Sequence, residues 1–82
     1  MTREEVFEMV SQYFTEQFEV PPEKIEPQAH LFKQLGLDSI DALDMIAYLE
    51  TELDIEVVEK ELKSLRTVQD VVDYILTKVG EG

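Results

Sequence analysis

The chain has 82 residues and no cysteine, so it can build one modest hydrophobic core without disulfides, thiolate ligands or an enclosed cleft between two domains. We therefore expect a single domain over residues 1–82 that catalyses no reaction by itself. Nineteen acidic residues against seven basic ones give a net charge of −12, which repels nucleic acid and attracts proteins with arginine or lysine patches.

Neither a signal peptide nor a membrane span is expected. The start lacks a cationic stretch followed by an apolar one, and the apolar runs are only a few residues long. We expect a soluble cytoplasmic monomer that does not insert into membranes.

The first expected helix spans residues 3–18. Thr2 and Glu5 have the spacing of a capping box at its start, and Val20-Pro21-Pro22 ends the helical pattern. Apolar side chains recur between these limits at helical spacing, and we assign them to the core: Val6, Phe7, Met9, Val10, Tyr13, Phe14 and Phe18.

A long connection follows over residues 21–37, marked by three prolines and Gly36. Connections of this length are usually functional or disordered. Isolated apolar side chains favour an ordered loop that is anchored on the bundle and delivers Ser39 to the surface: Ile25, Leu31, Phe32 and Leu35.

The second helix, expected over residues 39–53, has two apolar arcs when its residues are placed about 100° apart. The core-facing arc consists of Ala42, Met45, Ile46, Leu49 and Leu53, and the outward arc consists of Ile40, Leu43 and Ala47. Carboxylates lie around the outward arc: Asp41, Asp44 and Glu50. An apolar centre with a charged rim is typical of a protein interface. Nine acidic residues against Lys60 give residues 38–61 a local net charge of −8.

Two further helices complete the pattern. Val57, Val58, Leu62 and Leu65 support only a short third helix, at about residues 58–64. Thr67 and Asp70 open a last helix, at 67–79, with a variant capping box. Its apolar stripe and its stop are Val68, Val71, Val72, Ile75, Leu76, Val79 and Gly80. The expected fold is all-α: a small four-helix bundle with three longer helices, a short third helix and a long first loop.

Ser39 is the residue most indicative of function. It stands where the long loop meets the second helix, with aspartates at 38, 41 and 44 and no histidine beside it, so its hydroxyl lacks a base to make it a nucleophile. A phosphodiester attached there would lie against the free N–H groups and positive dipole end of the helix. Ser39 is therefore better placed to be modified than to catalyse.

These features together resemble the acyl carrier proteins. The resemblance covers nearly the whole chain and rests on an Asp-Ser pair between Leu-Gly and an acidic helix, with a final helix opening about thirty residues later. The residues that carry it are Leu35-Gly36-Leu37-Asp38-Ser39-Ile40 and Thr67-Val68-Gln69-Asp70-Val71-Val72-Asp73-Tyr74-Ile75.

The resemblance implies that a separate phosphopantetheinyl transferase esterifies Ser39 with 4′-phosphopantetheine from coenzyme A. It implies that Asp38 assists that transferase, partly through the enzyme's metal ion. The arm's thiol would hold acyl groups as thioesters, which explains how a chain without cysteine could carry them. Acyl-processing enzymes with basic patches would dock on Ile40, Asp41, Leu43, Asp44, Ala47 and Glu50.

The resemblance also implies a pocket for the acyl chain between the last three helices. Its lining would be Ile46, Leu49, Leu62, Leu65, Val68, Val71 and Ile75. Three positions depart from the pattern of fatty-acid carriers. Ile40 stands where they usually have Leu, Val58 where they often have Pro, and Leu37 where a smaller residue is common. Housekeeping fatty-acid synthesis, a specialised lipid pathway and a polyketide pathway all stay open.

Several alternatives remain beside this interpretation. Ser39 alone could be an ordinary helix cap. Within the carrier class, a peptidyl, aryl or D-alanyl carrier shares the Asp-Ser site, and in another class the chain would be an unmodified acidic interaction module. A serine hydrolase lacks a base and an oxyanion-hole motif, and His30 has no companion ligand or triad.

We expect no defined metal site. Glu50, Glu52, Asp54 and Glu61 mimic part of an EF-hand loop, but Ile55 occupies the position that requires glycine.

Overall fold

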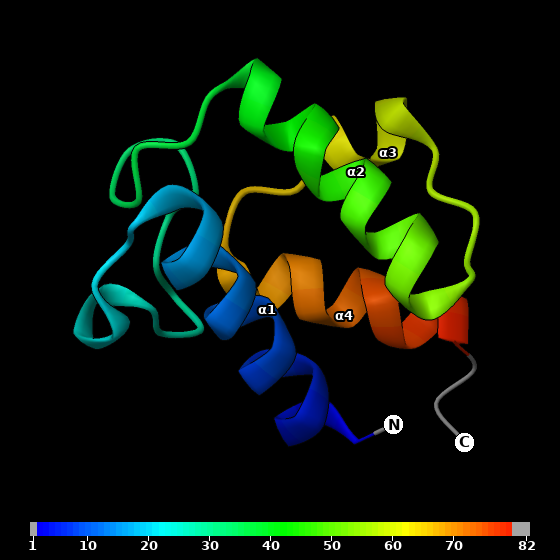
Figure 1. Cartoon of the computed structure of the whole chain (residues 1–82), viewed down its shortest axis with the longest axis horizontal. Coiled ribbons are helices and arrows are strands. Elements are labelled where there is room, and N and C mark those ends of the chain that lie inside the picture. Colours follow the sequence, from blue (N-terminus) through cyan, green and yellow to red (C-terminus); the bar gives the residue numbers. More distant parts are fainter. Residues whose placement is uncertain (1, 80–82) are drawn as a thin grey trace.

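The computed structural model describes residues 2–79, which form a small bundle of helices (Figure 1). In chain order the elements are α1 (Arg3–Phe18), the 3-10 helix η1 (Pro22–Lys24), α2 (Ser39–Leu53), α3 (Glu59–Lys63) and α4 (Val68–Val79). Across residues 2–79 the only β-type pairing is an isolated bridge between His30 and Thr67. The all-α class, with a short third helix and a long first connection, is confirmed.

The helix limits differ from the expected ranges only in the second half of the chain. The third helix is one residue shorter at each end, because Val58 is its extended N-cap and Ser64 its C-cap. The last helix begins at Val68, one residue later than expected, because Thr67 forms the reciprocal hydrogen bonds of a capping box. The Thr67 hydroxyl accepts from the Asp70 N–H at 3.2 Å, and Asp70 Oδ2 accepts from the Thr67 N–H at 3.2 Å. Gly80, the expected stop, lies outside the described residues.

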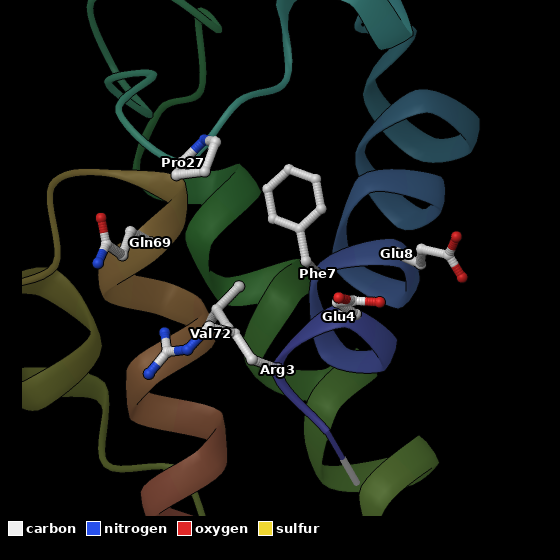
Figure 2. Close-up of a pocket in the computed structure, with 7 residues that line it drawn as sticks. All are labelled: Arg3, Glu4, Phe7, Glu8, Pro27, Gln69 and Val72. Carbon is white, nitrogen blue, oxygen red and sulfur yellow. The ribbon is translucent and has the colours of Figure 1, made fainter.

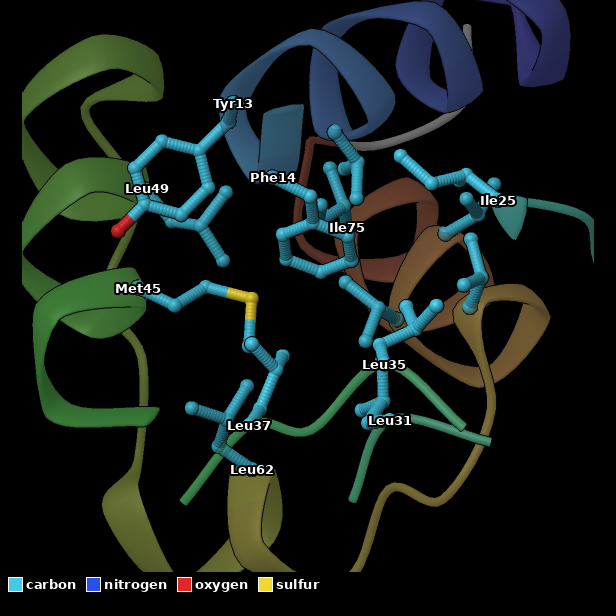
Figure 3. Packing of buried hydrophobic residues seen from close by; sticks show 14 of the residues in the cluster. Tyr13, Phe14, Ile25, Leu31, Leu35, Leu37, Met45, Leu49, Leu62 and Ile75 are labelled. Carbon is cyan, nitrogen blue, oxygen red and sulfur yellow. The ribbon is translucent and has the colours of Figure 1, made fainter. Parts of the chain in front are cut away.

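The core is built mainly from α1, α2 and α4, where α1 packs against α4 and α2 runs obliquely past α4 (Figure 1). Phe14, Leu49 and Ile75 are among its largest fully buried side chains, and Figure 3 shows them converging with Met45 from α2. Phe7, Met9 and Phe18 differ from the expectation, since they are only half-buried and pack at the edge of this core.

The long connection between α1 and α2 is tied to the start of α4. The Leu31 N–H donates to the Arg66 carbonyl at 2.8 Å, and the Val68 N–H donates to the Ala29 carbonyl at 3.1 Å. Of its expected anchors, Ile25, Leu31 and Leu35 are buried, whereas Phe32 is 39% exposed. Backbone bonds and three buried side chains therefore order this loop.

Side chains from neighbouring helices hold α3, which is too short to be stable alone. The Tyr74 hydroxyl accepts from the Val58 N–H at 3.2 Å and donates to Glu61 Oε1 at 2.9 Å. Lys78 Nζ lies 3.5 Å from the same Glu61 oxygen. The Val57 N–H donates to Glu50 Oε2 at 3.2 Å, which fixes the segment that enters α3.

Candidate functional site

Ser39 is the first residue of α2, and Asp38 is the residue that caps the helix. Asp38 Oδ1 accepts from the Asp41 N–H at 3.0 Å, and Asp41 Oδ2 accepts from the Asp38 N–H at 3.2 Å. The Ser39 side chain is exposed and makes no hydrogen bond to any residue that the structure describes. Capping, the ordinary role for a serine here, is therefore performed by its neighbour.

The loop presents Ser39 by burying the residues just before it. Leu35 and Leu37 are buried on either side of Gly36, whose positive φ of 74° is a backbone conformation that glycine adopts without strain. The Leu37 N–H donates to the Leu31 carbonyl at 3.0 Å, which closes the loop. Two residues beyond this anchor the chain emerges at the surface with Ser39 at the start of α2.

This position suits a phosphodiester. The first N–H groups of an α-helix have no partner within the helix, and the capping box satisfies only those of Asp38 and Asp41. The N–H groups of Ser39 and Ile40 therefore remain available to phosphate oxygens, at the positive end of the helix dipole. The fit depends on an exposed, uncommitted hydroxyl beside free backbone donors.

His30 has a structural role in the same loop. Its Nδ1 accepts from the Phe32 N–H at 3.3 Å and from the Lys33 N–H at 3.2 Å, so the ring caps a turn of the connection. This ring nitrogen therefore holds the backbone of the loop in its turn.

The outward arc of α2 is exposed, as its spacing predicts. Ile40 is 70% exposed and Leu43 is 49% exposed, and Ala47, Asp44 and Glu50 are also exposed. On the opposite side Ala42, Met45 and Leu49 are buried, with Ile46 and Leu53 half-buried. We call Ile40, Asp41, Leu43, Asp44, Ala47 and Glu50 the α2 surface.

Two carboxylates of the α2 surface also hold local structure. Asp41 is half-buried and accepts from the Asp38 N–H, and Glu50 accepts from the Val57 N–H. Asp44 makes no hydrogen bond or ion pair within the described part of the chain. Its substitution therefore removes no hydrogen bond or ion pair of the described residues.

The seven residues expected to line an acyl pocket occupy the core and its edge. Leu49, Leu62, Val68, Val71 and Ile75 are at most 3% exposed. Ile46 and Leu65 are half-buried. Figure 3 shows Leu49, Leu62 and Ile75 among closely packed neighbours. An acyl chain that entered here would have to displace this packing.

Two exposed apolar residues differ from what the sequence predicts. Phe32, an expected anchor of the loop, is 39% exposed, and Val58, expected within the third helix, is 42% exposed. Val57 and Val58 are neighbours in extended backbone, where successive side chains point to opposite sides. Since Val57 is buried, Val58 must face outward.

A groove of about 600 Å³ lies elsewhere, between α1 and α4 (Figure 2). We call it the α1–α4 groove, and its lining comprises Arg3, Glu4, Phe7, Glu8, Pro27, Gln69 and Val72. None of these residues belongs to α2 or to the expected acyl pocket.

Within residues 2–79 no group of three or more His, Cys, Asp or Glu side chains is arranged to hold a metal ion. Over the same residues, none of the helices is long and apolar enough to cross a membrane.

Comparison with known proteins identifies the family of this chain. The profile of the phosphopantetheine attachment site matches residues 8–75. The chain belongs to the acyl carrier protein family. Acyl carrier proteins are carriers without catalytic activity of their own, and their cofactor is covalently attached 4′-phosphopantetheine, so the resemblance seen in the sequence is confirmed.

Relatives of this carrier match it over nearly its full length. It is 39% identical over 80 residues to an acyl carrier protein of Thermosynechococcus vestitus, covering 98% of this chain and 99% of the relative. It is 42% identical over 75 residues to acyl carrier protein 2 of Ralstonia nicotianae, covering 92% and 93%. The crystal structure of an acyl carrier protein from Thermotoga maritima superimposes with a TM-score of 0.83 at 27% identity, covering 99% of this chain and 94% of that one.

Proposed function

We propose that Ser39 is the residue that carries 4′-phosphopantetheine, and that the chain is an acyl carrier for fatty-acid, specialised-lipid or polyketide enzymes. The supporting observation is the division of roles at the start of α2, where Asp38 caps the helix and leaves the Ser39 hydroxyl exposed. In the transfer, Ser39 Oγ forms a bond to the phosphorus next to the pantetheine of coenzyme A and the pyrophosphate P–O bond breaks. Adenosine 3′,5′-bisphosphate leaves, and the hydroxyl proton passes to a base of the transferase. Once attached, the arm supplies a thiol that holds acyl groups as thioesters.

The residues around Ser39 have distinct tasks in this proposal. Asp38 keeps the helix start ordered through its bond to the Asp41 N–H, and its carboxylate would assist the transferase, partly through the enzyme's metal ion. The N–H groups of Ser39 and Ile40 receive the phosphodiester. The loop anchors at Leu35 and Leu37 hold the attachment point clear of the core.

Intact mass tests the attachment. The unmodified protein is incubated with coenzyme A and a promiscuous phosphopantetheinyl transferase, and the wild type is expected to gain one phosphopantetheine. Ser39→Ala should gain none. Ser64→Ala is the matched control, since Ser64 is also exposed, and it should be modified like the wild type. An unchanged wild-type mass would favour an unmodified acidic interaction module instead.

The α2 surface is proposed to dock the transferase and the acyl-processing enzymes. Its apolar centre at Ile40, Leu43 and Ala47 would be covered by the partner, and Asp44 would meet an arginine or lysine. Asp44→Lys is expected to slow loading by a purified acyltransferase at least several-fold without loss of helicity. Glu23→Lys makes the same charge change in η1 and should leave loading unchanged. Equal slowing in both variants would contradict docking on α2.

The chain is also proposed to shelter its cargo among the seven core residues named for the acyl pocket. Each buried methylene contributes about 0.8 kcal/mol, so the melting temperature of the acylated carrier should rise with chain length. A melting temperature independent of chain length would mean that the acyl group stays in solvent.

The remaining proposals concern identity and context. The named relatives are acyl carriers, which favours acyl cargo over peptidyl, aryl or D-alanyl cargo. We propose a single domain over residues 1–82 that acts in the cytoplasm as a monomer. Comparing malonyl, fatty-acyl and amino-acyl donors in a loading assay discriminates the carrier subtypes.

A further inference from the structure

The α1–α4 groove has a largely apolar floor. Phe7 from α1, Val72 from α4 and Pro27 from the long loop form it, and Figure 2 shows the Phe7 ring projecting between the two helices toward Pro27. Val72 is 1% exposed, whereas Phe7 is only half-buried. Part of an aromatic ring is thus left uncovered at the surface of a small domain.

The rim of this groove is acidic. Arg3 forms an ion pair with Asp73 of α4, so its positive charge is already balanced. Glu4 and Glu8 are exposed, lie one helical turn apart on α1 and belong to the lining of the groove, although the Glu8 carboxylate points away from α4 in Figure 2. Neither has an ion-pair partner within residues 2–79, so the rim carries an uncompensated charge of about −2.

We propose that the α1–α4 groove is a second docking surface, which binds an amphipathic segment of a partner protein through one apolar side chain flanked by arginine or lysine. The apolar side chain covers the Phe7 ring, and the cations meet Glu4 and Glu8. A second copy of this chain fits poorly, because two molecules of net charge −12 repel one another.

This surface is separate from the one proposed around Ser39. The groove residues come from α1, α4 and the long loop, and none comes from α2. In Figure 1 α1 begins at the bottom of the view, and α2 begins at the top. A partner in the groove therefore leaves Ser39 free for other enzymes, and the inference goes beyond the carrier function proposed above.

A peptide titration followed by NMR tests the groove. The probe is a synthetic alanine-rich helical peptide with one leucine flanked by arginines, and its control has alanine in place of the leucine. The leucine peptide is expected to shift the amide signals of Phe7, Gln69 and Val72 in a saturable way. It should bind about tenfold more tightly than the control, a difference of about 1.4 kcal/mol.

Charge reversal at the rim supplies the matched variants. The double variant Glu4→Lys and Glu8→Lys should weaken leucine-peptide binding about tenfold. The double variant Glu16→Lys and Glu23→Lys changes net charge equally at exposed positions outside the groove and should weaken it much less. Circular dichroism verifies that both variants stay helical.

Three outcomes would overturn the inference: shifts confined to the α2 surface, equal binding of the two peptides, or equal weakening in the two double variants. Each would leave the modification of Ser39 unaffected, so this proposal and the carrier proposal fail separately.

Discussion

At the residue scale, two adjacent side chains divide the work at the start of α2. From the sequence Ser39 is a candidate helix cap, but the structure gives that role to Asp38, and both residue types are common at this position. The deciding signal is at Asp41, three residues after Asp38, because its carboxylate can return a hydrogen bond to the cap backbone. Ala42, three residues after Ser39, has no such group. The cap could therefore have been assigned from the sequence by looking for the reciprocal bond.

Tyr13 shows how the fold alters a single group. Its ring stacks on Tyr48, with centroids 3.9 Å apart, and only 6% of the residue is exposed. Burial, with a smaller contribution from the nearby Asp44 carboxylate, raises the pKa of Tyr13 to about 12. The folded state therefore favours the neutral hydroxyl.

This shift predicts a loss of stability in alkali. Because the pKa of Tyr13 is higher in the folded state, its neutral hydroxyl contributes to the free energy of unfolding. This contribution is complete below pH 10 and is lost as pH rises toward about 12. Tyr13→Phe retains the ring without the titrating group, so its stability should fall less steeply than that of the wild type over this range. Urea unfolding at a series of pH values measures both slopes, and parallel curves would refute the assignment.

At the element scale, α2 serves two environments at once. One face supplies Met45 and Leu49 to the core, and the other exposes Ile40 and Leu43. Helical periodicity predicted this division, because both faces depend only on the position of each residue around one axis. The extra bond from Glu50 to the Val57 N–H was not predictable, since it depends on the path of the chain beyond α2.

The cap of α2 can be separated from its charge. Asp38→Ala removes the acceptor for the Asp41 N–H and should reduce the free energy of unfolding by about 1 kcal/mol. Asp38→Asn keeps an acceptor oxygen and should stay close to the wild type in stability. Urea unfolding provides these values. If Asp38→Asn lowers the free energy of unfolding as much as Asp38→Ala does, the carboxylate charge rather than the cap hydrogen bond stabilises the helix start.

The attachment of α3 depends on Tyr74. Tyr74→Phe removes the acceptor for the Val58 N–H and the donor to Glu61, and should cost about 1 kcal/mol of local stability. Hydrogen exchange at residues 58–64 should accelerate while exchange in α1 stays unchanged. Glu61→Gln is the companion variant, because it retains an acceptor and weakens only the ion pair with Lys78. Uniform acceleration across all helices would indicate global rather than local destabilisation.

At the scale of the whole molecule, periodicity predicted the bundle and the exposed face of α2, but it did not predict the surface between α1, α4 and the long loop. Phe7 has the helical spacing of a core residue, and Phe32 is an apolar side chain expected to anchor the long loop, yet both are partly exposed. Their burial depends on how the long loop crosses α1 and α4, which local patterns do not encode. The α1–α4 groove arises from the same packing, and so it too had no signal in the sequence.

The net charge of −12 predicts that the fold is sensitive to salt. Like charges repel in the compact state, and about 0.15 M salt shortens the range of that repulsion to about 8 Å. The melting temperature should therefore rise with sodium chloride, and magnesium at equal ionic strength should raise it at least as much. Calorimetry measures both, and a melting temperature indifferent to salt would show that repulsion does not limit stability.

The most direct test of the account is to locate the phosphopantetheine on the modified protein. Trypsin cuts after Lys33 and Lys60, and the peptide over residues 34–60 contains Ser39 as its only serine. Tandem mass spectrometry of the protein treated with coenzyme A and transferase should place one phosphopantetheine on Ser39 in that peptide. A modification on the peptides that contain Ser11 or Ser64, or on none, would contradict the claim.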